Sequence, residues 1–199
     1  MGRWAKVAAV ACGLLACPAA AETIRPYSAG PLRAGDFQKG PPAGIPHHAH
    51  TSTRLGYGFR YRSRTFNGSS VVVLSEVTLT NNLVQSESWT RRPGDAQLMQ
   101  HEQGHFDITE TVRRRARAYF TKQRMARIKF RASTLDGAVQ ALEEGMRKEM
   151  APFFARMPLL QRQYDAETQH GTNAAEQARW RKQLDLLLGD PTASIPAPR

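Results

Sequence analysis

The sequence predicts an α+β fold in which a small antiparallel sheet is followed by a long helix and two or three further helices. Two observations lead to this prediction. Residues 53–90 are rich in β-branched and aromatic side chains, which is typical of strands. From Ala96 onward the apolar residues recur at steps of three, four and seven, which is the spacing of one helix face.

The predicted strands are three runs of residues, Leu55–Tyr61, Ser70–Leu79 and Leu83–Trp89. The second run is β-branched and apolar, and the third alternates between apolar and polar residues. Asn67 and Gly68 separate the first two runs. This pair is typical of tight turns, so we expect a hairpin there.

The first helix is predicted over about 96–129, with Asp95 as its N-cap. A second helix is expected to begin after Ser133. Pro152 and Pro158 are predicted to interrupt or restart it, because a proline inside a helix removes a hydrogen bond and clashes with the preceding turn.

The first helix carries His101, Glu102 and His105, which have the H-E-x-x-H spacing of zinc hydrolases. Residues i and i+4 share one helix face, so both imidazoles can bind one Zn²⁺. Glu102 flanks that face, where its carboxylate can take a proton from a water activated by the metal. The sequence therefore predicts a mononuclear zinc site with Glu102 as the general base.

The two histidines lie in the same apolar stripe as Leu98, Ile108 and Val112. The alternative is that they are core histidines satisfied by hydrogen bonds alone. Two buried imidazoles one turn apart each need partners for their polar nitrogens, so a shared metal ion explains them better.

A zinc site needs a third protein ligand, for which the sequence offers two sources. Glu143 and Glu144 are one source, although they are also typical of a solvated helix face. Residues 164–171 are the other, because they combine a phenol, two carboxylates, a hydroxyl and an imidazole before a glycine. His170 is the expected third ligand. The alternative for this stretch is the polar end of a helix.

Two further roles are predicted within 164–171. Tyr164 can donate a hydrogen bond to the oxyanion that forms during hydrolysis, which makes it a candidate catalytic residue beside Glu102. Asp165 or Glu167 can orient a ligand imidazole through its second nitrogen.

Residues 1–21 have the pattern of a secretory signal peptide. Arg3 and Lys6 precede a short apolar run, and three alanines precede a cleavage site after Ala21, so a periplasmic or secreted protein is expected. Both cysteines lie in this leader, which excludes disulfides and thiolate zinc ligands from the exported chain. Membrane association is expected only if Cys17, in a loose lipidation motif, carries a lipid; simple cleavage fits better.

Removal of 21 residues from 199 leaves 178, which is enough for one domain with its own core. The composition divides the exported chain into a Pro/Gly-rich lead-in at 22–50, a single domain at 51–188 and a disordered tail at 189–199. The last helix of the domain is predicted over about 173–188, with Thr172 as its cap.

The exported chain is basic. Without Arg3 and Lys6, 26 of the 28 Lys and Arg remain against 17 Asp and Glu, a formal charge of +9. No nucleic-acid motif accompanies this charge, so no nucleic-acid partner is expected. A solvated basic surface is the simplest explanation, and contact with an anionic envelope surface or an acidic substrate is the alternative. We expect a monomer.

His47, His48 and His50 form a histidine cluster in the lead-in. Three imidazoles in four residues can chelate a transition metal loosely. A flexible tract lacks the fixed geometry that selects one ion, so a solvated polar loop is the favoured interpretation.

H-E-Q-G-H-F-D-I-x-E at 101–110, together with Y-D-x-E-T-x-H-G at 164–171, resembles the bacterial family of predicted secreted Zn-dependent proteases, also known as a domain of unknown function. The resemblance implies an exported, zincin-like α+β domain. It implies that His101 and His105 are zinc ligands and that Glu102 is the catalytic base. It implies no particular substrate.

The sequence thus supports an exported zinc-dependent metallopeptidase that holds one Zn²⁺ per chain and cleaves a peptide or protein substrate, conceivably one associated with the envelope. The second hypothesis is a non-catalytic cationic envelope protein with a structural or vestigial zinc site. A third is a metal chaperone or sensor that uses residues 47–50.

Overall fold

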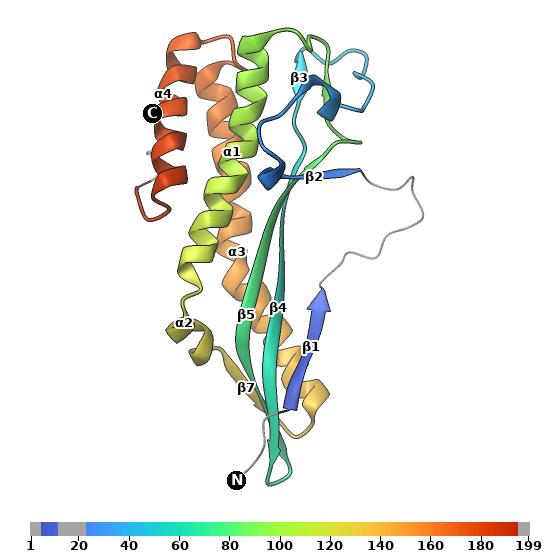
Figure 1. Ribbon diagram of the computed structural model, residues 1–199, viewed down its shortest axis with the longest axis vertical. Helices are drawn as coiled ribbons and strands as arrows, with labels where there is room; N and C mark the ends of the chain where they lie inside the picture. The colour runs from blue at the N-terminus through green and yellow to red at the C-terminus, as the bar shows by residue number, and fades with distance from the viewer. Residues whose placement is uncertain (1–4, 12–22, 195–199) are drawn as a thin grey trace. The chain divides into compact units, whose positions relative to one another are not determined.

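The computed structural model describes residues 5–11 and 23–194 (Figure 1). Within these residues the chain is a mixed α+β structure with four helices and small antiparallel sheets, which confirms the predicted fold class. The chain forms two compact units. The first unit contains residues 5–11, 57–79 and 116–154, and the second contains residues 23–56, 80–115 and 155–194.

Four long elements contribute residues to both units: β4 (Thr53–Phe66), β5 (Ser69–Val84), α1 (Ala96–Tyr119) and α3 (Leu135–Thr168). β4 and β5 are joined by the predicted turn, in which Asn67 and Gly68 have φ angles of 47° and 68°. β5 is one strand where two were predicted. The polar residues around Asn81 look like a break in the sequence, but the Asn81 side chain is buried and donates to Phe106 O at 3.2 Å.

The larger sheet has the strand order β1-β4-β5-β2, and β7 also pairs with β5. The short strands of this sheet are β1 (Ala5–Ala11), β2 (Ile24–Pro26) and β7 (Lys129–Ala132). Each of them pairs antiparallel with its neighbour. A smaller sheet joins β3 (Ala49–His50) to β6 (Trp89–Thr90), with His50 opposite Trp89. The lead-in is therefore tied down at two places, by β2 and by β3.

The predicted leader includes β1, so cleavage after Ala21 would remove this strand. The cleavage site, both cysteines and residues 195–199 lie outside the described residues. The leader and its cleavage stay a prediction. No helix in the described part of the chain is both long and apolar enough to span a membrane.

The first helix is shorter than predicted, because α1 ends at Tyr119 and not at Lys129. The hydroxyl of Thr121 accepts from Arg124 N at 3.1 Å and starts the short helix α2 (Lys122–Arg127). β7 follows directly and pairs with β5. The ladder hydrogen bonds of β7 satisfy the backbone where a longer helix was expected.

Pro152 and Pro158 do not interrupt α3, so that prediction was wrong. Both prolines are exposed, and α3 has buried residues on either side of them, such as Met150 before and Leu160 after. Most helix stability in proteins comes from packing of the apolar face. Burial of both parts of α3 offsets the cost of about 3 kcal/mol for a proline in a helix interior.

The last helix, α4 (Ala174–Gly189), begins close to the predicted position. Asn173 is its cap, since its side chain accepts from a first-turn N–H at 3.2 Å, whereas Thr172 donates to the carbonyl of Gln169 at 2.7 Å. α4 lies alongside α1 and the end of α3 (Figure 1). Trp180 on α4 meets Tyr164 on α3 edge to face, with ring centroids 5.3 Å apart.

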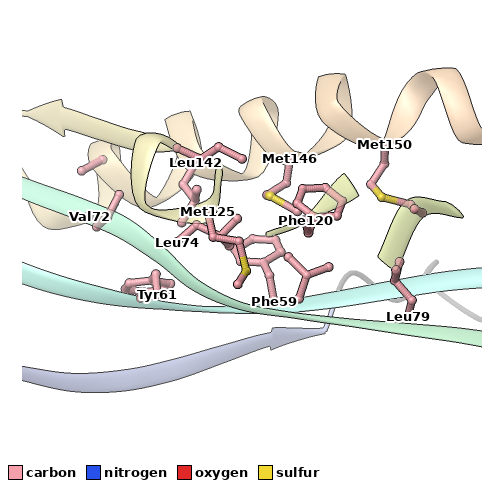
Figure 2. Packing of buried hydrophobic residues seen from close by; sticks show 14 residues of the cluster. Phe59, Tyr61, Val72, Leu74, Leu79, Phe120, Met125, Leu142, Met146 and Met150 are labelled. Atoms are coloured by element: carbon pink, nitrogen blue, oxygen red, sulfur yellow. The ribbon is translucent and has the colours of Figure 1, made fainter. Parts of the chain in front are cut away.

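The core of the first unit lies between strand residues of β4 and β5 and the apolar face of α3 (Figure 2). Met146 and Met150 extend from α3 toward Phe120, and Phe59 and Leu74 face them from the strands. Methionine is flexible, so it fills the irregular space between a twisted sheet and a helix.

Candidate metal centre

Three side chains with metal-ligand atoms meet in the second unit: His101 and His105 on α1, and Asp165 on α3. One nitrogen or oxygen of each lies within 4.8 Å of the others. The imidazole rings of the two histidines have centroids 4.8 Å apart, so they leave the same face of α1, as their spacing predicted.

The three atoms have nearly equal separations. His101 Nε2 and His105 Nε2 are 3.2 Å apart, and Asp165 Oδ1 lies 3.2 Å from the first and 3.0 Å from the second. A tetrahedral zinc ion with bonds of about 2.0–2.1 Å separates its ligand atoms by about 3.3 Å. The donor atoms are therefore spaced as an ion of this size and geometry requires.

The protonation of His105 is fixed by Gln161, one turn before Asp165 on α3. The Gln161 Nε2 group donates to His105 O at 2.9 Å, which leaves Oε1 to face His105 Nδ1 at 2.5 Å. A carbonyl oxygen can only accept, so His105 Nδ1 carries the proton. The neutral ring then presents a lone pair on Nε2, toward Asp165 and His101.

Thr168 likewise fixes the position of the proton on the His101 imidazole. Its hydroxyl donates to Tyr164 O at 2.6 Å, so only its lone pairs are left for His101 Nδ1 at 3.4 Å. His101 Nδ1 is therefore the protonated nitrogen, and Nε2 again carries a lone pair. Such hydrogen bonds on the far nitrogen are the usual support of a metal-binding histidine.

The site thus brings three electron-pair donors to within 3.0–3.2 Å of one another. Donors at this distance repel unless a cation stands between them. The His101 side chain is 2% exposed, so water screens this repulsion little. The residues fit a bound metal ion, and the Nε2 atoms with one carboxylate oxygen are a donor set that zinc accepts.

The Asp165 carboxyl is ready to act as an anionic ligand. Burial alone would raise its pKa, but in the metal-free site the imidazole N–H groups of His101 and His105 can turn toward the carboxylate, and hydrogen bonds from them hold the pKa far below its usual range. Its side chain remains 31% exposed, so the third donor faces both the two imidazoles and the solvent side of the site.

Asp165, and not His170, completes this group of atoms. His170 Nδ1 lies 3.3 Å from Asp165 Oδ1, but its ring is 53% exposed and rests against His47, with centroids 4.4 Å apart. The reason is that α3 ends at Thr168. Gln169 and His170 have φ angles of 50° and 52°, which turn the chain before His170 can point along the helix face of Asp165.

Tyr164 packs against the imidazoles and does not line the cleft beside them. Its ring stacks on His101 at 4.7 Å between centroids and meets His105 edge to face at 5.1 Å. Neighbouring helix residues point about 100° apart, so Tyr164 cannot share the direction of Asp165. This placement gives no support to the expected oxyanion role and makes Tyr164 the packing surface of the histidine pair.

Two glycines of the sequence motifs permit this packing. A Cβ atom on Gly104 would stand 2.3 Å from Tyr164 Oη, so α1 and the phenol can approach only because residue 104 has no side chain. A Cβ on Gly171 would stand 2.8 Å from His101 Cβ, and the φ of Gly171 is +84°. Both glycines lie inside the two sequence motifs, so the sequence contained the residues that permit this close packing.

Glu102 is 3% exposed and lines the same cleft as the three donors. Thr51 Oγ1 donates to Glu102 Oε2 at 2.5 Å and fixes the carboxylate. Burial lowers the pKa of His50, and the charge of Glu102 partly opposes this shift. Burial would also lower the pKa of His105, but the hydrogen bond with Asp165 and the charge of Glu102 raise it above its ordinary value. Thr51 follows β3 and lies far from Glu102 in the sequence, so no local pattern predicted this contact.

The cleft has a volume of about 400 Å³. Residues of α1, α3 and the segment 47–53 line it. His47, His48 and His50 are among these residues, and His47 and His50 are exposed, as in the solvated loop that the sequence favoured. The pairing of β3 with β6 holds Ala49 and His50 in place beside the cleft.

The remaining acidic residues of the two motifs have structural partners. Asp107 accepts from Tyr27 Oη at 2.7 Å and also pairs with Arg181. Glu110 accepts from Arg113 Nη2 at 2.7 Å. Glu167 accepts from Trp180 Nε1 at 2.8 Å and pairs with Arg179. These residues tie the lead-in and α4 to the helices that carry the site.

The alternative ligands Glu143 and Glu144 do not belong to the group of converging donor atoms. Glu144 pairs with Arg147 and with Lys148, the latter at 3.5 Å. Both partners are exposed on the same helix, as expected of a solvated helix face.

Comparison with known families gives one match. The family described as "Bacterial protein of unknown function (DUF922)" matches residues 23–171. The chain belongs to this family. The matched region includes the lead-in strands and all three donors of the candidate metal centre. No match is found among curated proteins or among solved structures.

Substitution of Gly104 by alanine is expected to destabilise the protein by about 1–3 kcal/mol, because the new methyl group overlaps the Tyr164 ring. Urea unfolding measures the change. Gly189→Ala is the control, since a Cβ there meets nothing within 4 Å. It should change the unfolding free energy by less than about 1 kcal/mol. Equal stability of Gly104→Ala and wild type would contradict the described packing.

Substitution of Asp165 by asparagine is expected to lower the affinity for Zn²⁺ at least about a hundredfold, because it removes an anionic donor from the group. His170→Ala should lower it far less, since His170 lies outside the group. Competition with a chromophoric chelator measures both affinities. The exposed Asp136→Asn is the control for the loss of one charge. A larger loss in His170→Ala than in Asp165→Asn would restore His170 as the third ligand.

Substitution of Gln161 by alanine is expected to weaken Zn²⁺ binding about 10- to 100-fold without removing any ligand. The reason is that His105 Nδ1 loses the acceptor that fixes its proton. Gln163→Ala is the control. Gln163 lies two residues away on α3, and among the described residues its side chain forms a hydrogen bond only with Glu167. Equal affinities in the two variants would show that the hydrogen bond to His105 is without effect.

Proposed function

We propose that this protein is an exported zinc-dependent metallopeptidase that holds one Zn²⁺ between His101, His105 and Asp165. The observation that carries the proposal is the convergence of two imidazole lone pairs and a carboxylate oxygen beside the fixed carboxylate of Glu102. The resemblance of the two motifs to predicted secreted Zn-dependent proteases supports the same function, as does the zincin-like order of a sheet followed by an H-E-x-x-H helix.

A zinc ion in this position supplies a Lewis acid, which activates water and polarises the carbonyl of a peptide bond. Glu102 is the group that moves protons. Its carboxylate takes a proton as the water oxygen bonds to the carbonyl carbon, and it returns that proton to the amine as the carbon–nitrogen bond breaks. The products are a carboxylic acid and an amine.

Thr51 is a positioning residue in this proposal. Its hydroxyl holds Glu102 Oε2 at 2.5 Å, so the other oxygen of the carboxylate can be aimed at the reacting water. Gln161 and Thr168 position the ligands in the same sense, through the Nδ1 atoms of the imidazoles. None of these three residues needs to touch the substrate.

The alternative is a non-catalytic cationic envelope protein with a structural zinc. Structural zinc sites use four protein ligands, whereas catalytic ones use three and leave a place for water. The described residues contribute three converging donors, and these open onto a cleft that contains Glu102. A carboxylate fixed beside the ligands has no use in a structural site, so both features favour catalysis.

Substitution of Glu102 by glutamine is expected to retain about one Zn²⁺ per chain and to lower the rate of peptide hydrolysis about 10²- to 10⁴-fold, because the amide cannot accept the proton. Zinc content is measured by atomic emission, and hydrolysis by cleavage of a peptide library. Glu76→Gln is the control, since the Glu76 side chain is 53% exposed and lies in the first unit. Hydrolysis by Glu102→Gln at the wild-type rate would contradict the role of Glu102.

A further inference from the structure

The charged side chains of the cleft differ in whether they already have a partner. Both of its carboxylates already have partners: Glu102 accepts from Thr51, and Asp165 contacts the imidazoles. Arg162 lines the same cleft, is exposed, and has no ion-pair partner among the described residues. An arginine carries its charge at every physiological pH and presents a planar fork of donors that matches a carboxylate. Among the described residues of the cleft, Arg162 is therefore a permanent cation that is available for a ligand.

Arg162 is close to the candidate metal centre along α3. It precedes Asp165 by three residues, which corresponds to about 4.5 Å along the helix axis and about 60° around it. A flexible arginine side chain covers this separation easily. Arg162 can therefore contact a group bound directly next to the three donor atoms, and not only a group at the far end of the cleft.

Among the described residues, the rest of the cleft wall adds no competing negative charge. Met157 and Pro158 continue the α3 side of the cleft, and Leu98 lines it from α1. On the opposite segment, the imidazoles of His47 and His50 can donate hydrogen bonds. A ligand with an apolar body and one carboxylate satisfies these groups, whereas a cationic side chain meets Arg162.

We propose that the cleft selects peptides that carry a carboxylate next to the bond to be cleaved, and that Arg162 binds this carboxylate. This inference rests on the proposed peptidase function of the same cleft and names its substrate class. The carboxylate comes either from the free C-terminus of a peptide or from an Asp or Glu side chain. Both sources offer the guanidinium the same pair of oxygens.

The test is a binding measurement in zinc-loaded Glu102→Gln protein, which separates recognition from hydrolysis. Two pairs of acetylated peptides are titrated by calorimetry. Penta-alanine with a free carboxyl end is compared with its amide, and Ala-Ala-Asp-Ala-Ala amide with its Asn counterpart. The acidic member of at least one pair is expected to bind about 10- to 100-fold more tightly than its neutral partner. The pair that shows this preference identifies the source of the carboxylate.

Arg162→Ala and Arg162→Gln are expected to abolish the preference and to keep about one Zn²⁺ per chain. The second variant retains much of the side-chain stem, so loss of packing is controlled. Arg156→Ala removes an equal charge from an exposed position on the same helix, outside the cleft lining, and should keep the preference. Equal binding of acidic and neutral peptides would overturn the proposal. So would an equal loss of preference in Arg156→Ala, which would indicate a general effect of the basic surface.

The two proposals fail in different measurements. Carboxylate preference that depends on Arg162, in a protein whose wild-type form cleaves no peptide, would support the recognition site and contradict the peptidase. Cleavage by the wild type without any such preference would support the peptidase and contradict the role of Arg162.

Discussion

The candidate metal centre depends on the hydrogen bonds that the two imidazoles make on their far nitrogens. Gln161 fixes the proton of His105 on Nδ1, and Thr168 does the same for His101. Without these contacts either ring could turn its protonated nitrogen toward Asp165, and the three lone pairs would not converge. Both supporting residues lie on α3, as Asp165 does, so one helix supplies the third donor of the candidate centre and the orientation of the two imidazoles.

This arrangement requires α1 and α3 to approach closely, and the sequence provides for it with glycine. Gly104 gives the Tyr164 ring room against α1, and Gly171 gives His101 room against the chain that leaves α3. Asp107 then attaches the lead-in through Tyr27 and α4 through Arg181. The conspicuous residues of the two motifs thus divide into those that meet at the donor atoms and those that hold the surrounding elements together.

Local patterns in the sequence were sufficient for part of this structure. The strands and the histidine pair follow from periods of two and 3.6 residues, and the turn follows from the Asn67–Gly68 pair. Short segments determine each of these features by themselves. Interactions across the chain decided the rest. Asp165 lies beside the histidine pair, and His170 does not, because the backbone turns at the end of α3. α3 continues through Pro152 because packing outweighs a missing hydrogen bond. The contact from Thr51 to Glu102 joins residues that no local pattern relates.

Because α3 is one unbroken helix, metal binding at one of its ends affects the stability of the protein. One unbroken helix carries Met146 in the core of the first unit and Asp165 among the donor atoms of the second. Any ion that binds only the folded chain adds its binding free energy to the unfolding equilibrium. Metal bound at Asp165 therefore opposes fraying of the same helix that the first unit needs for its core. Under the proposed function, the supply of zinc would then set how long each molecule persists, in addition to whether it works.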